Sequence, residues 1–144
     1  MMYSIKEVAE LFGLSVYTLR YYDKAGLLPF VSKNEAGYRV FTESDLGFIQ
    51  TICCLKDTGM PVKTIKVYID YCMEGTKSIP KRCALLAQHR QNVLAEIESL
   101  QQNLKEVDEK LATYTSPEAV KVVAAMRQFS SAEKERYGLY NPYR

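Results

Sequence analysis

The sequence has no apolar run of the roughly 18 to 20 residues that a membrane-spanning helix needs. Its first ten residues, MMYSIKEVAE, also lack the apolar segment of a secretory signal. It contains no phosphate-binding glycine loop, no nucleophile elbow and no acid pair in a recognisable pocket, and its only histidine is His89. We therefore expect a cytoplasmic protein that is not an enzyme, uses no cofactor and has no membrane partner.

Charge of one sign is also scarce. The 144 residues carry a net charge of +2, and the first 70 hold eight Lys or Arg against eight Asp or Glu. This excludes a strongly basic domain, so a nucleic-acid interface would depend on where individual charges lie. The cysteines lack the regular spacing of a small disulfide-linked scaffold, and we expect reduced thiols at Cys53, Cys54, Cys72 and Cys83.

The first 25 residues carry the start and stop signals of two short helices. Ser4 and Glu7 form a capping box, and the apolar residues that follow share one helical face. Gly13 can end this helix in a left-handed conformation, and Ser15 can cap a second helix over residues 16–25. Two short helices joined by a three- or four-residue turn predict a helix-turn-helix.

The next segments complete a small domain. LLPFVSKNEAGYRVF has two extended runs around a polar tip at residues 32–37, which predicts a β-hairpin, or wing. Thr42 and Asp45 can cap a third helix, and residues 62–71 suit a short fourth helix after Gly59-Met60-Pro61. The pattern predicts a mainly α fold with a small β wing, a winged helix-turn-helix domain over residues 1–75.

A long uninterrupted helix is predicted after a linker at residues 76–80. Residues 81–115 contain no Gly or Pro, and apolar residues recur by threes and fours apart from Arg90, which is typical of a coiled coil. The stripe consists of Leu86, Val93, Ile97, Leu100, Leu104, Val107, Leu111 and Tyr114. A domain of about 75 residues cannot line a helix of roughly 50 Å, so we expect a homodimer. Residues 116–144 form a C-terminal tail with room for a short helix at 119–129.

The second helix carries the residues that most favour a binding function. At 100° per residue, Val16 and Leu19 face the core, whereas Tyr17, Arg20, Tyr21 and Lys24 share the opposite face, with Tyr22 near the boundary. In a DNA-binding helix-turn-helix this helix enters the major groove. The alternative is that the tyrosines cover apolar surface and Arg20 pairs with Asp23. The predicted DNA contacts are Ser15, Tyr17, Thr18, Arg20, Tyr21 and Lys24, with Lys33, Tyr38 and Arg39 on the wing and Lys56 and Lys63 on the next two helices.

Three stretches together resemble one family of bacterial transcriptional regulators, the MerR family. They are IKEVAELFGLSVYTLRYYDKAGLLPF, GYRVFTESDL and LKDTGMPVKTI, which match its TLRYYE-type recognition helix, its R-x-Y-type wing and its LR-x-x-G-type fourth-helix entry. Asp23 stands where Glu is usual, and Phe41 where the wing commonly has Tyr. The resemblance covers residues 3 to about 114. It implies an antiparallel coiled-coil dimer that binds a palindromic, double-stranded promoter and distorts it so that RNA polymerase can engage.

The sequence allows several alternatives for the signal to which such a regulator would respond. A sensor of large aromatic drugs would need a further domain of more than a hundred residues, and far fewer follow the coiled coil. A metal sensor would need several converging thiolates or imidazoles, and only Cys83 stands at the start of the dimerisation helix. The sequence around Cys54 resembles a branch that responds to aldehydes, electrophiles or nitrosative stress through one cysteine at this position. Lys56 nearby would favour its thiolate chemistry, and Cys53 fits the core register better. An architectural DNA-bending protein that senses nothing, or a coiled coil that only binds protein, remain alternatives.

Overall fold

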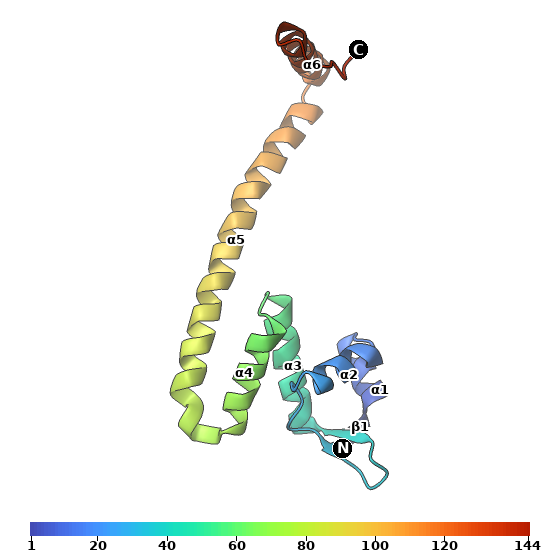
Figure 1. Cartoon of the computed structure of the whole chain (residues 1–144), viewed down its shortest axis with the longest axis vertical. Helices are drawn as coiled ribbons and strands as arrows, with labels where there is room; N and C mark the ends of the chain where they lie inside the picture. The colour runs from blue at the N-terminus through green and yellow to red at the C-terminus, as the bar shows by residue number, and fades with distance from the viewer. The chain divides into compact units, whose positions relative to one another are not determined.

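The computed structural model describes residues 1–144, and helices dominate it (Figure 1). None of the helices combines the length and the apolar composition that a membrane-spanning segment requires. The contacts divide the chain into two units, Met1–Leu94 and Ala95–Arg144. In chain order the elements are β1 (Met2–Ser4), α1 (Ile5–Phe12), α2 (Val16–Lys24), β2 (Ser32–Lys33), β3 (Arg39–Thr42), α3 (Glu43–Asp57), α4 (Val62–Met73), the short 3-10 helix η1 (Gly75–Ser78), α5 (Ile79–Thr115) and α6 (Ala119–Arg136).

The helix ends follow the capping residues in the sequence. The Ser4 hydroxyl accepts a hydrogen bond from the Glu7 amide, and the Glu7 carboxylate accepts one from the Ser4 amide, so the capping box of α1 is confirmed. Gly13 ends α1 with φ 64°, a left-handed conformation that favours glycine. Ser15 caps α2 by accepting from the Thr18 amide. The turn between α1 and α2 is therefore held by side chains at both ends.

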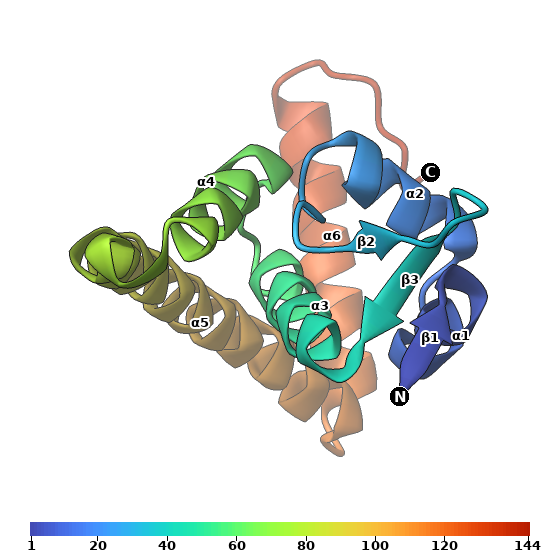
Figure 2. The same cartoon turned by 90° about the horizontal axis from the view of Figure 1, so that it is seen from below.

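The wing belongs to a three-stranded antiparallel sheet with the order β1-β3-β2 (Figure 2). Lys33 pairs with Arg39 across the hairpin, and the Asn34 side chain accepts from the Tyr38 amide at the tip. The sequence predicted only the two hairpin strands. It did not predict β1, in which Tyr3 pairs with Phe41, because three residues are too few to show an alternating pattern.

One apolar core holds the first unit together. Tyr22 is 1% exposed in this core, although helix spacing placed it at the boundary. The end of α3 covers it, and burial raises the pKa of the Tyr22 phenol, an effect that the nearby Lys56 ammonium opposes. The core consists of Val8, Ala9, Leu19, Tyr22, Leu27, Leu28, Val31, Phe41, Ile49, Ile52, Leu55, Met60, Ile65 and Ile69.

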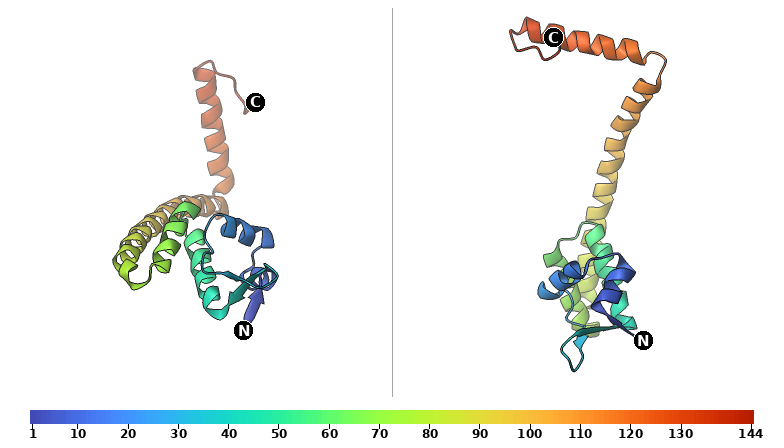
Figure 3. Two further views of the ribbon diagram at one scale, coloured as in Figure 1. Left: turned by 60° about the horizontal axis from the view of Figure 1, so that its bottom comes forward. Right: turned by 90° about the vertical axis from the view of Figure 1, so that its right-hand side faces the viewer.

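A compact turn joins α4 to α5 (Figure 3), where the sequence predicted a linker at residues 76–80. The buried Ser78 hydroxyl lies 2.8 Å from the Gly75 carbonyl oxygen. The Arg82 guanidinium donates to the Ser78 hydroxyl over 2.9 Å, and to the carbonyl oxygens of Cys72 and Gly75 over 3.3 and 3.0 Å. Arg82 thus satisfies carbonyl groups at the end of α4 and fixes the start of α5.

In the second unit, α6 is longer than the predicted helix at residues 119–129, and the tail folds back along it. Buried Asn141 donates to the Ser131 hydroxyl over 2.8 Å and to the Glu135 carboxylate over 3.0 Å. Arg127 donates to the Tyr143 carbonyl oxygen over 3.1 Å. These polar contacts order the last residues, which lack the apolar pattern that would have revealed them in the sequence.

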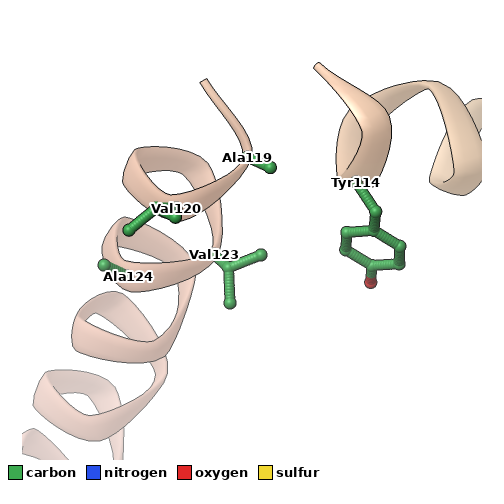
Figure 4. A pocket seen from close by; sticks show the side chains of 5 residues that line it. All are labelled: Tyr114, Ala119, Val120, Val123 and Ala124. Carbon is green, nitrogen blue, oxygen red and sulfur yellow. The ribbon is translucent and has the colours of Figure 1, made fainter. Parts of the chain in front are cut away.

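An apolar hollow of about 410 Å³, open to solvent, lies between the end of α5 and the start of α6. Figure 4 shows the Tyr114 ring on one side of it and Val123 on the other. Ala119, Val120 and Ala124 complete the lining. Tyr114 also ends the apolar stripe of α5, so the hollow continues that stripe onto α6.

Candidate nucleic-acid interface

Helix α2 presents a polar, aromatic and cationic face. Leu19 is fully buried beneath it, whereas Tyr17 is 80% and Tyr21 49% exposed. Arg20 and Lys24 are also exposed. No side chain among these four exposed residues makes a hydrogen bond or an ion pair within the chain, so all four polar groups are free to bind a ligand.

The N-terminal end of α2 is occupied by its own cap. The Ser15 and Thr18 hydroxyls lie 2.9 Å apart, and the Ser15 oxygen also accepts from the Thr18 amide over 3.0 Å. Both hydroxyls lie at the end of the helix that would enter a groove first. Their mutual bond fixes their positions before any ligand arrives.

Asp23 does not pair with Arg20, which answers the alternative raised by the sequence. Its carboxylate accepts two hydrogen bonds from Arg39, from Nε over 3.0 Å and from Nη2 over 2.9 Å. Arg39 Nη1 also donates to the Val31 carbonyl oxygen over 2.6 Å. The sequence had placed Arg39 among the DNA contacts, which stays a prediction; in the structure its guanidinium also joins α2 to the wing.

We expect Asp23→Ala to lower the free energy of unfolding by about 1 to 3 kcal/mol, because it removes a bidentate, charge-assisted pair whose side chains are less than a third exposed. Asp70→Ala is the matched control, because it breaks the exposed i,i+4 pair with Lys66 on α4 and should cost at most about 0.5 kcal/mol. Urea denaturation measures both. Equal losses in the two variants would contradict a bracing role for Asp23.

The remaining predicted DNA contacts, three lysines and one tyrosine, are exposed. Lys33 and Tyr38 lie on the wing, and Tyr38 is 71% exposed. Lys56 near the end of α3 and Lys63 at the start of α4 are exposed as well. A domain without net basic charge therefore still presents separate cationic groups on several elements.

The two adjacent cysteines of α3 differ in environment. Cys53 packs against the core, as its register predicted, and burial raises the pKa of its thiol, with Asp57 adding to the rise and Lys56 opposing it. Cys54 is exposed. Of the other cysteines, Cys83 is exposed and Cys72 half-buried, and no three Cys, His, Asp or Glu side chains come together to hold a metal ion.

Most of the apolar stripe of α5 is left uncovered by the rest of the chain. Leu100 is 64% exposed, and six further members of the stripe are 36 to 59% exposed. These are Leu86, Ile97, Leu104, Val107, Leu111 and Tyr114, while Val93 is half-buried. A stripe of this length left open to water is typical of an interaction surface.

Sequence reasoning missed one polar contact of α5. Thr58 Oγ1, at the C-terminal end of α3, lies 2.8 Å from His89 Nε2. The two residues are 31 positions apart, and neither periodicity nor a motif links them, so the sequence carried no signal for this pair.

Comparison with known proteins extends these observations. The sequence model of the "MerR HTH family regulatory protein" family matches residues 3–72. An uncharacterized HTH-type transcriptional regulator of Haemophilus influenzae is 40% identical over 126 residues, which cover 88% of this chain and 93% of that protein.

Solved structures agree with the sequence relatives. A MerR family transcriptional regulator from Bacillus thuringiensis is 45% identical with a TM-score of 0.74, covering 79% of this chain and 100% of that one. HiNmlR, described as a MerR family regulator lacking the sensor domain and bound to promoter DNA, is 40% identical with a TM-score of 0.78, covering 87% of this chain and 99% of that one.

Proposed function

This chain belongs to the MerR family of transcriptional regulators, and from that premise we propose that it binds a palindromic promoter as a homodimer and distorts the DNA to control transcription. The observation that carries the proposal is the α2 face, where Tyr17, Arg20, Tyr21 and Lys24 are exposed and have no partner within the chain. A face with this chemistry on the second helix of a helix-turn-helix suits the major groove.

Each part of the surface has a proposed role on DNA. Arg20 can donate two hydrogen bonds to a guanine or to a phosphate, and the tyrosine hydroxyls can donate to phosphate oxygens. Ser15 and Thr18, at the N-terminal end of α2, are proposed to contact the DNA as well. Cations on either side would hold the flanking phosphates: Lys33 on the wing, with Tyr38 beside it, and Lys56 and Lys63 on α3 and α4. Contacts on both sides of the groove can impose a bend.

The dimer is proposed to form through α5. At about 1.5 Å per residue, its 37 residues span roughly 55 Å, and a second copy offers an equally long apolar stripe. We propose an antiparallel coiled coil over residues 81–115, joined through residues 76–80 to the DNA-binding domain at 1–75. The C-terminal part, residues 116–144, adds the hollow beside Tyr114 to the same apolar surface.

Two copies related by a twofold axis would place two recognition helices on two half-sites, which accounts for a palindromic operator. The relative HiNmlR is described as bound to promoter DNA, which supports the same use of this chain. A bent promoter would then present its elements to RNA polymerase. The whole process is proposed to take place in the cytoplasm.

For the signal, we propose modification of the Cys54 thiol by an aldehyde, another electrophile or a nitrosative agent. Exposure supports this choice, since Cys54 is exposed on α3, whereas the Cys53 thiol is packed and its pKa is raised. Cys54 also lies one turn before the end of α3, where Thr58 contacts His89 of α5. A group added there could change how the DNA-binding domain is held.

We expect Cys54→Ser to abolish the response of transcription to an electrophile while promoter binding stays within about twofold, because serine has a similar size and no thiolate. The measurement is in vitro transcription with RNA polymerase from the protein's own promoter, with and without formaldehyde, methylglyoxal or a nitric oxide donor. Cys83→Ser is the matched control, because Cys83 is the other exposed thiol, and it should respond like the wild type.

Other outcomes would assign the signal differently. A response that persists in Cys54→Ser removes this thiol from the mechanism. A response to zinc alone would favour the metal-responsive alternative. Bending and binding without any effector response would leave an architectural DNA-bending protein.

A further inference from the structure

His89, the only histidine of the chain, reaches from α5 to the end of α3. Its Nε2 atom lies 2.8 Å from Oγ1 of Thr58, the residue that caps the C-terminus of α3. The same hydroxyl lies 2.7 Å from the Cys54 carbonyl oxygen, which also accepts from the Thr58 amide over 3.0 Å. The last turn of α3 is thereby connected to α5 through a single hydroxyl group.

The geometry assigns a direction to each hydrogen bond. Thr58 has one hydroxyl hydrogen, and the carbonyl oxygen of Cys54 can only accept. The hydroxyl therefore donates to that carbonyl and accepts from His89, which must carry a hydrogen on Nε2. Both the neutral Nε2–H tautomer and the imidazolium have this hydrogen. The bond is thus compatible with either protonation state of the ring.

Of the polar contacts between α5 and the earlier helices, this bond lies farthest along α5 from the turn at η1. The others are at the first turns of α5: Lys81 lies 3.9 Å from the Glu74 carboxylate, and Arg82 donates to the end of α4 and to the Ser78 hydroxyl. Arg82 and His89 are seven residues apart, which is two helical turns, so they lie on one side of α5 about 10 Å from each other. Leu85 lies between them and packs against the core. An attachment at one point permits pivoting, whereas two points along the helix fix its direction.

We propose that the Thr58–His89 hydrogen bond is a positioning contact that fixes the direction of α5 against the DNA-binding domain and thereby sets the distance between the two recognition helices of a dimer. The proposal rests on the proposed function, which supplies the dimer on DNA. The middle of the apolar stripe, near Leu100, is 18 residues beyond Arg82, or roughly 27 Å along the helix. A 5° pivot at Arg82 would displace the dimer axis by roughly 2 Å, comparable with the 3.4 Å rise of one base pair.

The experiment compares DNA affinities for palindromes whose half-sites are at the natural spacing or one base pair closer or farther apart. Thr58→Val and His89→Leu each remove one side of the bond. We expect both to reduce the spacing preference of the wild type about fivefold. Affinity for an isolated half-site should not change, because neither residue lies on the DNA-binding surface. A general loss of stability would instead lower affinity for every spacing alike.

Two variants control for side effects. Thr51→Val removes a hydroxyl that bonds only the carbonyl oxygen of Gly47, four residues earlier on the same helix, and should keep the wild-type preference. His89→Gln retains an N–H donor on a chain of similar reach and should restore much of the preference that His89→Leu loses. If Thr58→Val and His89→Leu keep the wild-type spacing preference, the proposal is wrong.

A second measurement needs no DNA. Residual dipolar couplings of α3 and of the first turns of α5 should fit one rigid alignment in the wild type and separate alignments in Thr58→Val. The side-chain Nε2–H signal of the single histidine should be protected from exchange in the wild type and lose that protection in the same variant. If the wild type fails to bind any palindrome as a dimer, the proposed function fails, and these couplings still decide whether the bond fixes α5. A rigid alignment that persists in Thr58→Val overturns the proposal.

Discussion

Replacing Arg20 with alanine should abolish specific promoter binding while the protein remains folded and dimeric. Arg20 is exposed, has no partner within the chain and lies on the face of α2 opposite to buried Leu19. A bidentate contact to a base contributes about 1 to 3 kcal/mol, and a dimer has two such contacts. The expected loss is therefore about 2 to 6 kcal/mol, or roughly 30-fold to 10⁴-fold in dissociation constant. Fluorescence anisotropy on a labelled promoter fragment measures it.

The salt dependence of the same titration separates two roles of Arg20. A phosphate contact would lower the slope of log affinity against log salt by about one per contact, and its loss would affect all sequences alike. A guanine contact would instead relax specificity at one base pair of each half-site. Arg136→Ala, which removes the same charge from α6, is the control and should bind normally. Unchanged affinity in Arg20→Ala would exclude α2 as the recognition helix.

Replacing Leu104 with aspartate should convert the dimer to monomers. Leu104 is 55% exposed in the single chain, and a coiled-coil partner would bury it. Burying an unpaired carboxylate costs several kcal/mol, so the dissociation constant of the dimer should rise at least about 10³-fold. Promoter binding should fall with it, because monomers cannot occupy two half-sites together. Sedimentation velocity at several concentrations measures the dimer directly.

Gln102→Asp provides the matched control for this change. Gln102 is exposed and lies about 200° around the helix from Leu104, so the same carboxylate would face water. Circular dichroism of both variants shows whether α5 remains helical. A Leu104→Asp protein that remains dimeric at micromolar concentration would refute the proposed coiled coil, whatever its effect on DNA binding.

Local chemistry made much of the fold predictable. The capping boxes at Ser4 and Thr42, the left-handed Gly13 and the apolar spacing of the helices all act within a few residues, so the sequence displays them directly. The exposed face of α2 was predictable for the same reason. Helical spacing alone separates Arg20 from Leu19, and the structure agrees.

The features that could not be predicted depend on residues far apart in the chain. Tyr22 is buried because the end of α3 covers it, which helical spacing within α2 cannot reveal. The contacts of Arg39 with Asp23 and with the Val31 carbonyl join α2 to the wing, and no local pattern in the sequence indicates them. Asn141 is similar, because its partners on α6 become neighbours only when the tail folds back.

The order of the small sheet has a consequence for aggregation. Its two outer strands are its shortest, three residues in β1 and two in β2, and β2 ends at Lys33. Short edge strands that carry a lysine are poor templates for a strand of another molecule. Both edge strands are therefore too short to favour edge-to-edge growth of the sheet, and Lys33 adds a charge at the β2 edge. Association of chains at high concentration should therefore involve exposed helical surfaces, such as the apolar stripe of α5, and not extension of this sheet.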